Sequence, residues 1–187
     1  MFLTQIRGIS MFKRMLVALD NSDMSVAVFR RALEMAEATE STLMLLHVHN
    51  PGEPGAPEPP FVLGVDYGAD ISQELWESYR EQRYLYEQAQ VNHLAELAQS
   101  AQSIGVAAEY TFNGGNPGRL ICELATNWDA DLILMGRRGH SGLSELVIGS
   151  VSNYVMHHAP CSVLIIQGSK ERSPEPLQPA EANKVMA

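Results

Sequence analysis

The sequence predicts a doubly wound α/β domain built on a five-stranded parallel sheet. Short apolar runs of strand length alternate along the chain with stretches whose apolar residues recur at helical spacing. The apolar runs carry charge only at their edges, which is typical of parallel strands covered on both faces. The chain has 187 residues, of which 45% are hydrophobic, so its length and apolar content suit one core and a single domain.

The first strand-helix-strand unit spans the first quarter of the chain. Phe12 to Asp20 and Thr42 to Val48 read as two strands with short connections, which favour a right-handed parallel crossover. The apolar stripe expected for the helix between them is Val26, Phe29, Leu33, Ala36 and Ala38. Asn50 to Pro60 holds five of the ten prolines, and proline removes backbone donors, so we expect a loop or a lid there.

A long helix with an acidic outer face is expected from about Asp70, which forms a capping box with Gln73, to about Ser103. The side chains predicted to face the core are Ile71, Leu75, Tyr79, Leu94, Leu97, Ala101 and Ile104. Further strands are expected at Val106 to Phe112, Ala130 to Met135 and Ser162 to Gln167, with a helix opened by Asn116-Pro117.

The last predicted helix runs from about Ser144 to His158. Gly149 lies inside that range, and a glycine in a helix interior costs about 1 kcal/mol relative to alanine. Either a neighbour packs against its bare backbone, or the helix begins there. In outline, we expect an extension at residues 1–10, a domain at 11–167 with a Pro/Gly-rich insertion at 51–69, and a flexible tail at 168–187.

The charge distribution excludes some partners. The formal net charge is -9, and its whole excess falls in residues 51–130, where twelve acidic residues stand against three basic ones. A field of this sign works against binding to nucleic acid and anionic membranes. No apolar run approaches the roughly 18 residues that span a bilayer, and residues 1–10 lack a signal-peptide pattern. Cys122 and Cys161 fit neither a disulfide scaffold nor a zinc module, so we expect a cytoplasmic protein with reduced thiols.

A candidate ligand site follows from the fold class. In a doubly wound sheet, ligands bind beyond the carboxyl ends of the strands, where the winding reverses. This rule selects Asp20 and the loop GRRGHSG that follows Met135. Glycines let backbone amides approach a phosphate closely, and a helix start attracts anions. If a helix begins at Gly149, then Gly149, Ser150 and Ser152 present amides and hydroxyls to the same anion.

At these positions the sequence resembles a known family. Gly136, Gly139, Gly149 and Ser150 match the G-2x-G-9x-G-(S/T) pattern of the ATP-binding branch of the universal stress proteins. Four further segments look like that family in the same order: VALD (17–20), HV (47–48), DLILMGRRGHSGL (131–143) and GSVSNYVMHHAPCSVLII (149–166). The resemblance covers about residues 12–167, and it implies a Rossmann-like, adenine nucleotide alpha hydrolase-like fold.

The resemblance implies a site for an adenine nucleotide, ATP or AMP, with a divalent cation such as Mg²⁺ beside a triphosphate. It places Asp20 near the ribose and phosphates, the backbone of Val48 at the adenine, and Ala18 in the base pocket. The residues that it implies along the ribose and phosphates are Met135, Gly136, Arg138, Gly139, Gly149, Ser150, Val151 and Ser152. The family pattern also favours Arg138 over Arg137 for a phosphate contact.

Three functions stay open at this point. The first is a nucleotide-binding regulatory or stress-response protein, read by a protein partner through residues 51–104. The second is a slow ATPase or phosphotransferase that uses Asp20, a metal ion and Arg138, although GxxxxGK(S/T) and GxGxxG motifs are missing. The third is a partner-binding module independent of nucleotide. The family often pairs its last strands, so the resemblance further implies a homodimer through Ser162 to Ile166.

One histidine pair stands outside this site. His47 and His49 lie two positions apart on a predicted strand and therefore share a face. They could form a pair of metal ligands, but a satisfied structural role is the favoured interpretation.

Overall fold

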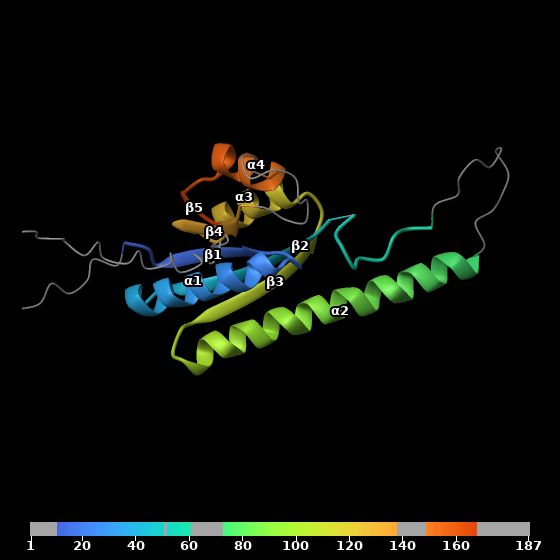
Figure 1. The fold of residues 1–187 in the computed structure, drawn as a ribbon, viewed down its shortest axis with the longest axis horizontal. Helices are drawn as coiled ribbons and strands as arrows, with labels where there is room; N and C mark the ends of the chain where they lie inside the picture. Colours follow the sequence, from blue (N-terminus) through green and yellow to red (C-terminus); the bar gives the residue numbers. More distant parts are fainter. Residues whose placement is uncertain (1–10, 51, 61–72, 138–148, 168–187) are drawn as a thin grey trace, which may run out of the picture.

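Five parallel strands form one sheet in the order β3-β2-β1-β4-β5 (Figure 1). The computed structural model describes residues 11–50, 52–60, 73–137 and 149–167. Its strands are β1 (Arg14–Leu19), β2 (Thr42–His49), β3 (Ala108–Gly114), β4 (Leu132–Gly136) and β5 (Ser162–Ile166). The chain builds outward from β1 through β2 to β3 and then reverses to β4 and β5. The predicted doubly wound parallel sheet is therefore confirmed.

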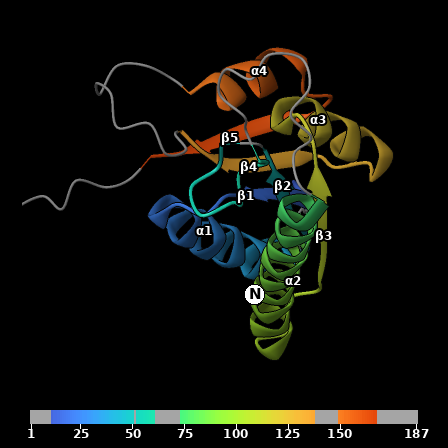
Figure 2. The same cartoon turned by 90° about the vertical axis from the view of Figure 1, so that its right-hand side faces the viewer.

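Helices cover both faces of this sheet. The described residues contain α1 (Asp23–Thr39), α2 (Gln73–Ser103), α3 (Pro117–Asn127) and α4 (Ser150–His158). As Figure 2 shows, α1 and α2 lie on one face, and α3 and α4 lie on the other. Alternate residues of β1 divide between two apolar clusters, Met15 with α1 and α2, and Leu16 with α3 and α4. No helix within the described ranges has the length and hydropathy to cross a bilayer.

The buried face of α1 differs from the predicted stripe. Val28, Phe29, Ala32 and Ala36 are buried, whereas the expected Val26 is 72% exposed. Phe29 and Ala36 were predicted, but Val28 and Ala32 were missed because the predicted stripe was rotated slightly about the helix axis. An alanine or valine fits either edge of an apolar stripe, so spacing alone leaves the phase open.

The second half of α2 supplies the side chains that this helix buries in the core. The helix has 31 residues, and its buried side chains are Leu94, Ala98 and Ala101. Figure 1 shows its first half running beyond the sheet, where large apolar side chains are exposed, namely Leu75, Trp76, Tyr84 and Leu85. Leu75, predicted to face the core, is therefore exposed, and Ile104, also predicted to face it, is exposed just after the other end of the helix. The sequence shows the periodicity of a helix, but it does not show where the sheet beneath that helix ends.

The start of α4 settles the question of Gly149. Its backbone is extended (φ -61°, ψ 153°) and it is the N-cap of a helix that begins at Ser150. The prediction of a helix that continues through Gly149 is thus wrong. Several expectations lie outside the described residues: the Asp70 cap, Arg138, Gly139, residues 51 and 61–69 of the predicted 51–69 insertion, and the segments 1–10 and 168–187.

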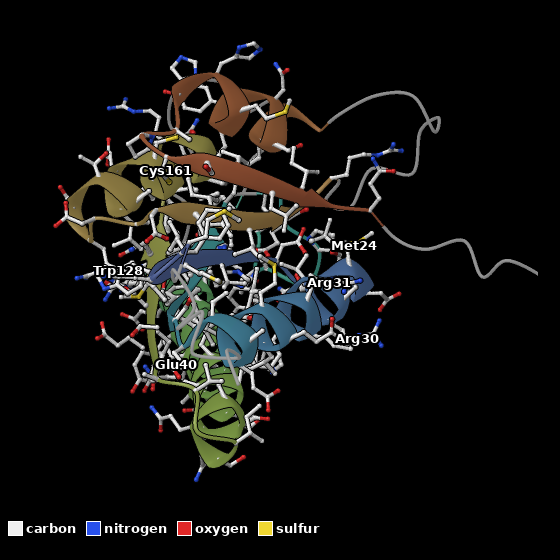
Figure 3. The ribbon with its side chains drawn as sticks, turned by 90° about the vertical axis from the view of Figure 1, so that its left-hand side faces the viewer. Met24, Arg30, Arg31, Glu40, Trp128 and Cys161 are labelled. Carbon is white, nitrogen blue, oxygen red and sulfur yellow. The ribbon has the colours of Figure 1, made fainter. Side chains whose placement is uncertain are left out.

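The two ends of the sheet differ in their side chains. Figure 3 labels Trp128, after α3, and Met24, in the first turn of α1, at opposite ends of the sheet. At the Trp128 end, the Arg14 guanidinium lies 4.3 Å from the centroid of the indole ring. There the Asp131 carboxylate also accepts the backbone N–H of Lys13 at 2.7 Å. The Met24 end, where the strands have their carboxyl termini, is the end that opens into a cavity.

Candidate functional site

A cavity of about 330 Å³ opens at the carboxyl ends of the strands, a size within the range of ligand pockets. It brings together nine of the predicted site residues: Ala18, Asp20, Val48, Met135, Gly136, Gly149, Ser150, Val151 and Ser152. The other two, Arg138 and Gly139, lie outside the described residues. The cavity sits where the sheet reverses its winding, between β1 and β4, as expected for this fold class.

The inner part of the cavity is apolar and is shaped by three neighbouring strands. Ala18 of β1 pairs in register with Leu46 of β2 and with Met135 of β4. These three residues line the cavity, and Ile121 of α3 closes it from the face of the sheet that α3 covers. The small side chain of Ala18 lies between two larger neighbours, so a flat apolar group can enter between β2 and β4.

Asp20 is fixed by the turn that leads into α1. Its Oδ1 accepts hydrogen bonds from the backbone N–H of Ser22 at 3.1 Å, from the Ser22 hydroxyl, and from the Ser25 hydroxyl at 2.8 Å. The backbone N–H of Asp20 donates to the Ser25 Oγ at 2.8 Å. Within the described part of the chain, Oδ2 accepts no hydrogen bond. The carboxylate is therefore held rigidly and keeps one oxygen for a ligand.

The start of α4 provides backbone donors to the same cavity. The first N–H groups of any helix lack an intrahelical partner, and here the N-cap Gly149 has no side chain to satisfy them. The amides of Ser150, Val151 and Ser152 therefore point out of the helix start, where the helix dipole favours an anion. Ser150 is exposed at this edge of the cavity, so its hydroxyl adds a further donor.

The hydroxyl of Ser152 contacts two backbone carbonyls. This buried hydroxyl lies 3.0 Å from the carbonyl oxygens of both Arg137 and Gly149 and donates to them. The Gly149 N–H also donates to the Arg137 carbonyl at 3.1 Å. Ser152 lines the cavity, but its hydroxyl ties the end of β4 to the start of α4. The predicted contribution of Ser152 to ligand binding stays a prediction, and its backbone amide belongs to the start of the helix.

Sequence reasoning missed several cavity residues. The loop after β2 contributes Asn50, Gly52, Glu53 and Pro54, and the start of α3 contributes Pro117. Arg137 also lines the cavity, next to the predicted Arg138. The Pro-rich composition predicted a loop or lid, but it did not indicate which of its residues line the cavity. Arg137 could have been included from the sequence, because it stands next to Arg138 in the same glycine-rich loop.

Glu53 is the centre of a buried polar cluster at the edge of the cavity. Its side chain is 7% exposed, and its Oε1 lies 3.1 Å from the His47 Nε2. The Tyr86 hydroxyl of α2 donates to Glu53 Oε2 at 3.1 Å. His49 Nδ1 lies 3.6 Å from Oε2, close enough for an ion pair when the ring is protonated, but it has no hydrogen-bond partner among the described residues. The structural role expected for the histidines is confirmed for His47.

These contacts shift the pKa values of Glu53 and Tyr86. Burial raises the pKa of the Glu53 carboxyl, but the hydrogen bond and charge of His47, together with Tyr86 and His49, outweigh burial and hold this pKa below its ordinary value. Burial, and then the negative charge of Glu53, raise the pKa of Tyr86 to about 12. Glu53 is thus an ionised acceptor and Tyr86 a neutral donor at neutral pH.

The fold and the cavity together define a doubly wound α/β domain with a ligand site at its switch point. The chain matches the model of the Universal stress protein family over residues 11–167. It is 36% identical over 159 residues to the universal stress protein Sll1388 of Synechocystis sp., an alignment that covers 83% of this chain and 98% of that relative. The chain therefore belongs to the universal stress protein family.

Two solved structures share the fold. A universal stress protein family protein from Arabidopsis thaliana with AMP bound aligns with a TM-score of 0.55 at 19% identity, covering 88% of this chain and 97% of that one. A universal stress protein in complex with cAMP aligns with a TM-score of 0.53 at 23% identity, covering 84% of this chain and 98% of that one.

Proposed function

We propose that the cavity binds an adenine nucleotide, ATP or AMP, and that the protein is a regulatory module of the stress response. One observation carries this proposal: a fixed carboxylate, an apolar slot and the amide-rich start of a helix line one cavity. These three features suit the ribose hydroxyls, the base and the phosphates of one nucleotide. The AMP and cAMP complexes of the two solved relatives support it.

In this proposal the adenine lies in the slot between β2 and β4, over Ala18 and against Met135. Val48, at the end of β2, supplies backbone groups that hydrogen-bond the edge of the base. Asp20 Oδ2 accepts from a ribose hydroxyl, since Oδ1 is already occupied by Ser22 and Ser25.

The phosphates lie at the start of α4. The amides of Ser150 and Val151 and the Ser150 hydroxyl donate to them, and Gly136 and Gly149 let the backbone approach closely. Arg138 and Gly139 complete this half of the site by resemblance. Of the described cavity residues, Arg137 is the one that carries positive charge.

A Mg²⁺ ion would need the nucleotide for its ligands. Within residues 11–50, 52–60, 73–137 and 149–167, no three His, Cys, Asp or Glu side chains gather as a metal site. Mg²⁺ is commonly held by one carboxylate together with substrate phosphates and water, an arrangement that Asp20 suits. A slow ATPase that uses Asp20, this ion and Arg138 is the alternative, and product analysis after incubation with Mg-ATP separates it from binding alone.

Two surfaces suit the partners of such a module. β5 is an edge strand that pairs only with β4 in the described sheet, so Ser162–Ile166 can pair with the same strand of a second copy to form a homodimer. The exposed first half of α2, within residues 51–104, offers a surface for a protein partner.

Isothermal titration calorimetry with ATP, ADP and AMP, with and without Mg²⁺, tests the proposal. We expect binding by the wild-type protein and a large loss in an Asp20→Ala variant. Asp23→Ala is the matched control, because Asp23 is exposed in the same turn and does not line the cavity. Absence of binding to all three nucleotides would reject the proposal.

A further inference from the structure

The loop that follows β2 forms one wall of the cavity, yet its backbone bonds are local. Asn50, Gly52, Glu53 and Pro54 line the cavity. The Glu53 N–H donates to the Asn50 carbonyl at 3.0 Å, and the Ala56 N–H donates to the Glu53 carbonyl at 3.0 Å. These bonds shape turns within the loop. They do not attach it to the sheet or to a helix.

The attachment runs through the Glu53 side chain. One carboxylate contacts β2 through His47 at 3.1 Å and α2 through the Tyr86 hydroxyl at 3.1 Å. Phe112 of β3 stacks on the His47 ring at a centroid distance of 5.5 Å, which fixes the orientation of the imidazole. A carboxylate that is 7% exposed is stable only when its oxygens are paired, so these contacts hold the loop in one position.

Tyr86 connects this wall to the other side of the cavity. Its hydroxyl oxygen accepts a hydrogen bond from Asn21 Nδ2 at 2.7 Å, while its proton goes to Glu53. Asn21 directly follows the cavity residue Asp20. One side chain of α2 therefore contacts the loop on one side and the turn beside Asp20 on the other. The aromatic ring of Tyr86 also packs against His49, with ring centroids 5.4 Å apart.

We propose that Glu53 is a positioning residue of the nucleotide site, which fastens the loop wall to β2 and, through Tyr86, links nucleotide binding to the order of α2. This inference rests on the proposed function, because it assigns a regulatory path to the same site. A nucleotide that contacts the wall and Asp20 at once stabilises both partners of Tyr86. The order of α2 around Tyr86 then depends on whether the nucleotide site is occupied. A partner that binds the exposed half of that helix can therefore distinguish the two states.

Three variants of the full chain test this inference. Glu53→Gln keeps the shape of the side chain but removes its charge, and Tyr86→Phe removes a single hydroxyl. Glu58→Gln is the matched control, because it makes the same change at an exposed position of the same loop that does not line the cavity. AMP and ATP affinities are measured by calorimetry, and circular dichroism verifies that each variant is folded.

The second readout is hydrogen exchange of the backbone, with and without AMP. We expect Glu53→Gln to weaken binding about tenfold or more and Glu58→Gln to leave it unchanged. In the wild type, AMP should slow exchange in α2 around Tyr86. In Tyr86→Phe, AMP should still bind within a few-fold of the wild-type affinity, but the slowing in α2 should disappear, which loss of stability alone would not produce.

The outcomes separate this inference from the proposed function. If the wild type binds no nucleotide, the nucleotide assignment is wrong, and faster exchange of residues 52–60 in Glu53→Gln than in Glu58→Gln still decides whether Glu53 anchors the loop. If the wild type binds AMP but Glu53→Gln binds it equally well, the positioning role is wrong. If α2 exchange responds to AMP equally in wild type and Tyr86→Phe, the link to α2 is wrong.

Discussion

The Ser152 hydroxyl and the Arg137 carbonyl lie 3.0 Å apart, so a side chain of α4 holds the end of β4. The same hydroxyl reaches the Gly149 carbonyl at 3.0 Å, which places the helix start directly beside the strand end. The Ser152 hydroxyl, together with the Gly149 N–H that donates to the Arg137 carbonyl, joins the start of α4 to the end of β4.

Replacing that group should affect both stability and binding. We expect Ser152→Ala to lower the free energy of unfolding by about 0.5–1.5 kcal/mol, because it removes a buried hydroxyl that hydrogen-bonds the Arg137 and Gly149 carbonyls, while each carbonyl keeps a backbone donor. Nucleotide affinity should fall as well, although the hydroxyl does not contact the phosphates. Urea denaturation and calorimetry measure the two effects. Asn153→Ala, at the next and exposed position, should leave affinity unchanged, and equal affinities in all three proteins would contradict the assigned role.

A glycine sets the distance between α3 and α4. A Cβ added at Gly118 would lie 2.7 Å from Tyr154 Cδ1 and 3.2 Å from its Cβ, so α4 would have to move. Alanine is the better helix former by about 1 kcal/mol, but the overlap should outweigh this gain and leave Gly118→Ala destabilised by about 1–3 kcal/mol. Gly114→Ala is the control, because its Cβ meets nothing within 4 Å. A Gly118→Ala protein more stable than the wild type would show that α4 adapts freely.

The Glu53 cluster should make stability depend on pH in a defined direction. Its folded pKa lies below the ordinary 4.5, so the unfolded chain takes up the proton first as pH falls. The stabilisation is therefore complete above about pH 4.5 and is lost as pH drops through the lower folded value. Denaturation of wild type and Glu53→Gln between pH 3 and pH 7 should show a wild-type advantage that shrinks toward the acidic end. A constant difference over this range would contradict the pKa shift.

Two leucines of α2 should differ sharply in their effect on stability. Leu94 is 1% exposed and belongs to the core, whereas Leu85 is 60% exposed. Leu94→Ala should cost about 2–5 kcal/mol, while Leu85→Ala, which keeps a good helix former, should change stability by less than about 0.5 kcal/mol. Thermal unfolding of the two variants provides the comparison. Similar losses in both would mean that the first half of α2 is covered in solution.

The sheet could be predicted from the sequence because its strands are buried on both faces. Leu43, Leu45 and Leu46 are almost fully buried, and such a run has few other interpretations. Two residues that line the cavity could also be predicted from local sequence. Asp20 directly follows the apolar run of β1, and Gly149 breaks a helical pattern.

Other features depend on contacts between distant segments. Glu53 sits among prolines, and nothing local distinguishes it from the exposed Glu58; its partners are His47 of the preceding strand β2 and Tyr86 of α2, 33 residues away. Ser152 resembles a phosphate ligand in sequence, whereas its donor direction depends on how β4 and α4 meet. The exposure of Leu75 likewise depends on the length of the sheet beneath α2.

The positions of the two tryptophans give this chain a pair of built-in optical reporters. Trp128 stacks under Arg14 at the end of the sheet opposite the cavity, and Trp76 lies 41% exposed on the first half of α2. Neither indole lines the cavity, so a bound base would not quench either one directly. Emission from a Trp128→Phe protein then comes from α2 alone. A spectral change in that protein on addition of nucleotide would show that binding in the cavity alters the surroundings of Trp76 on α2.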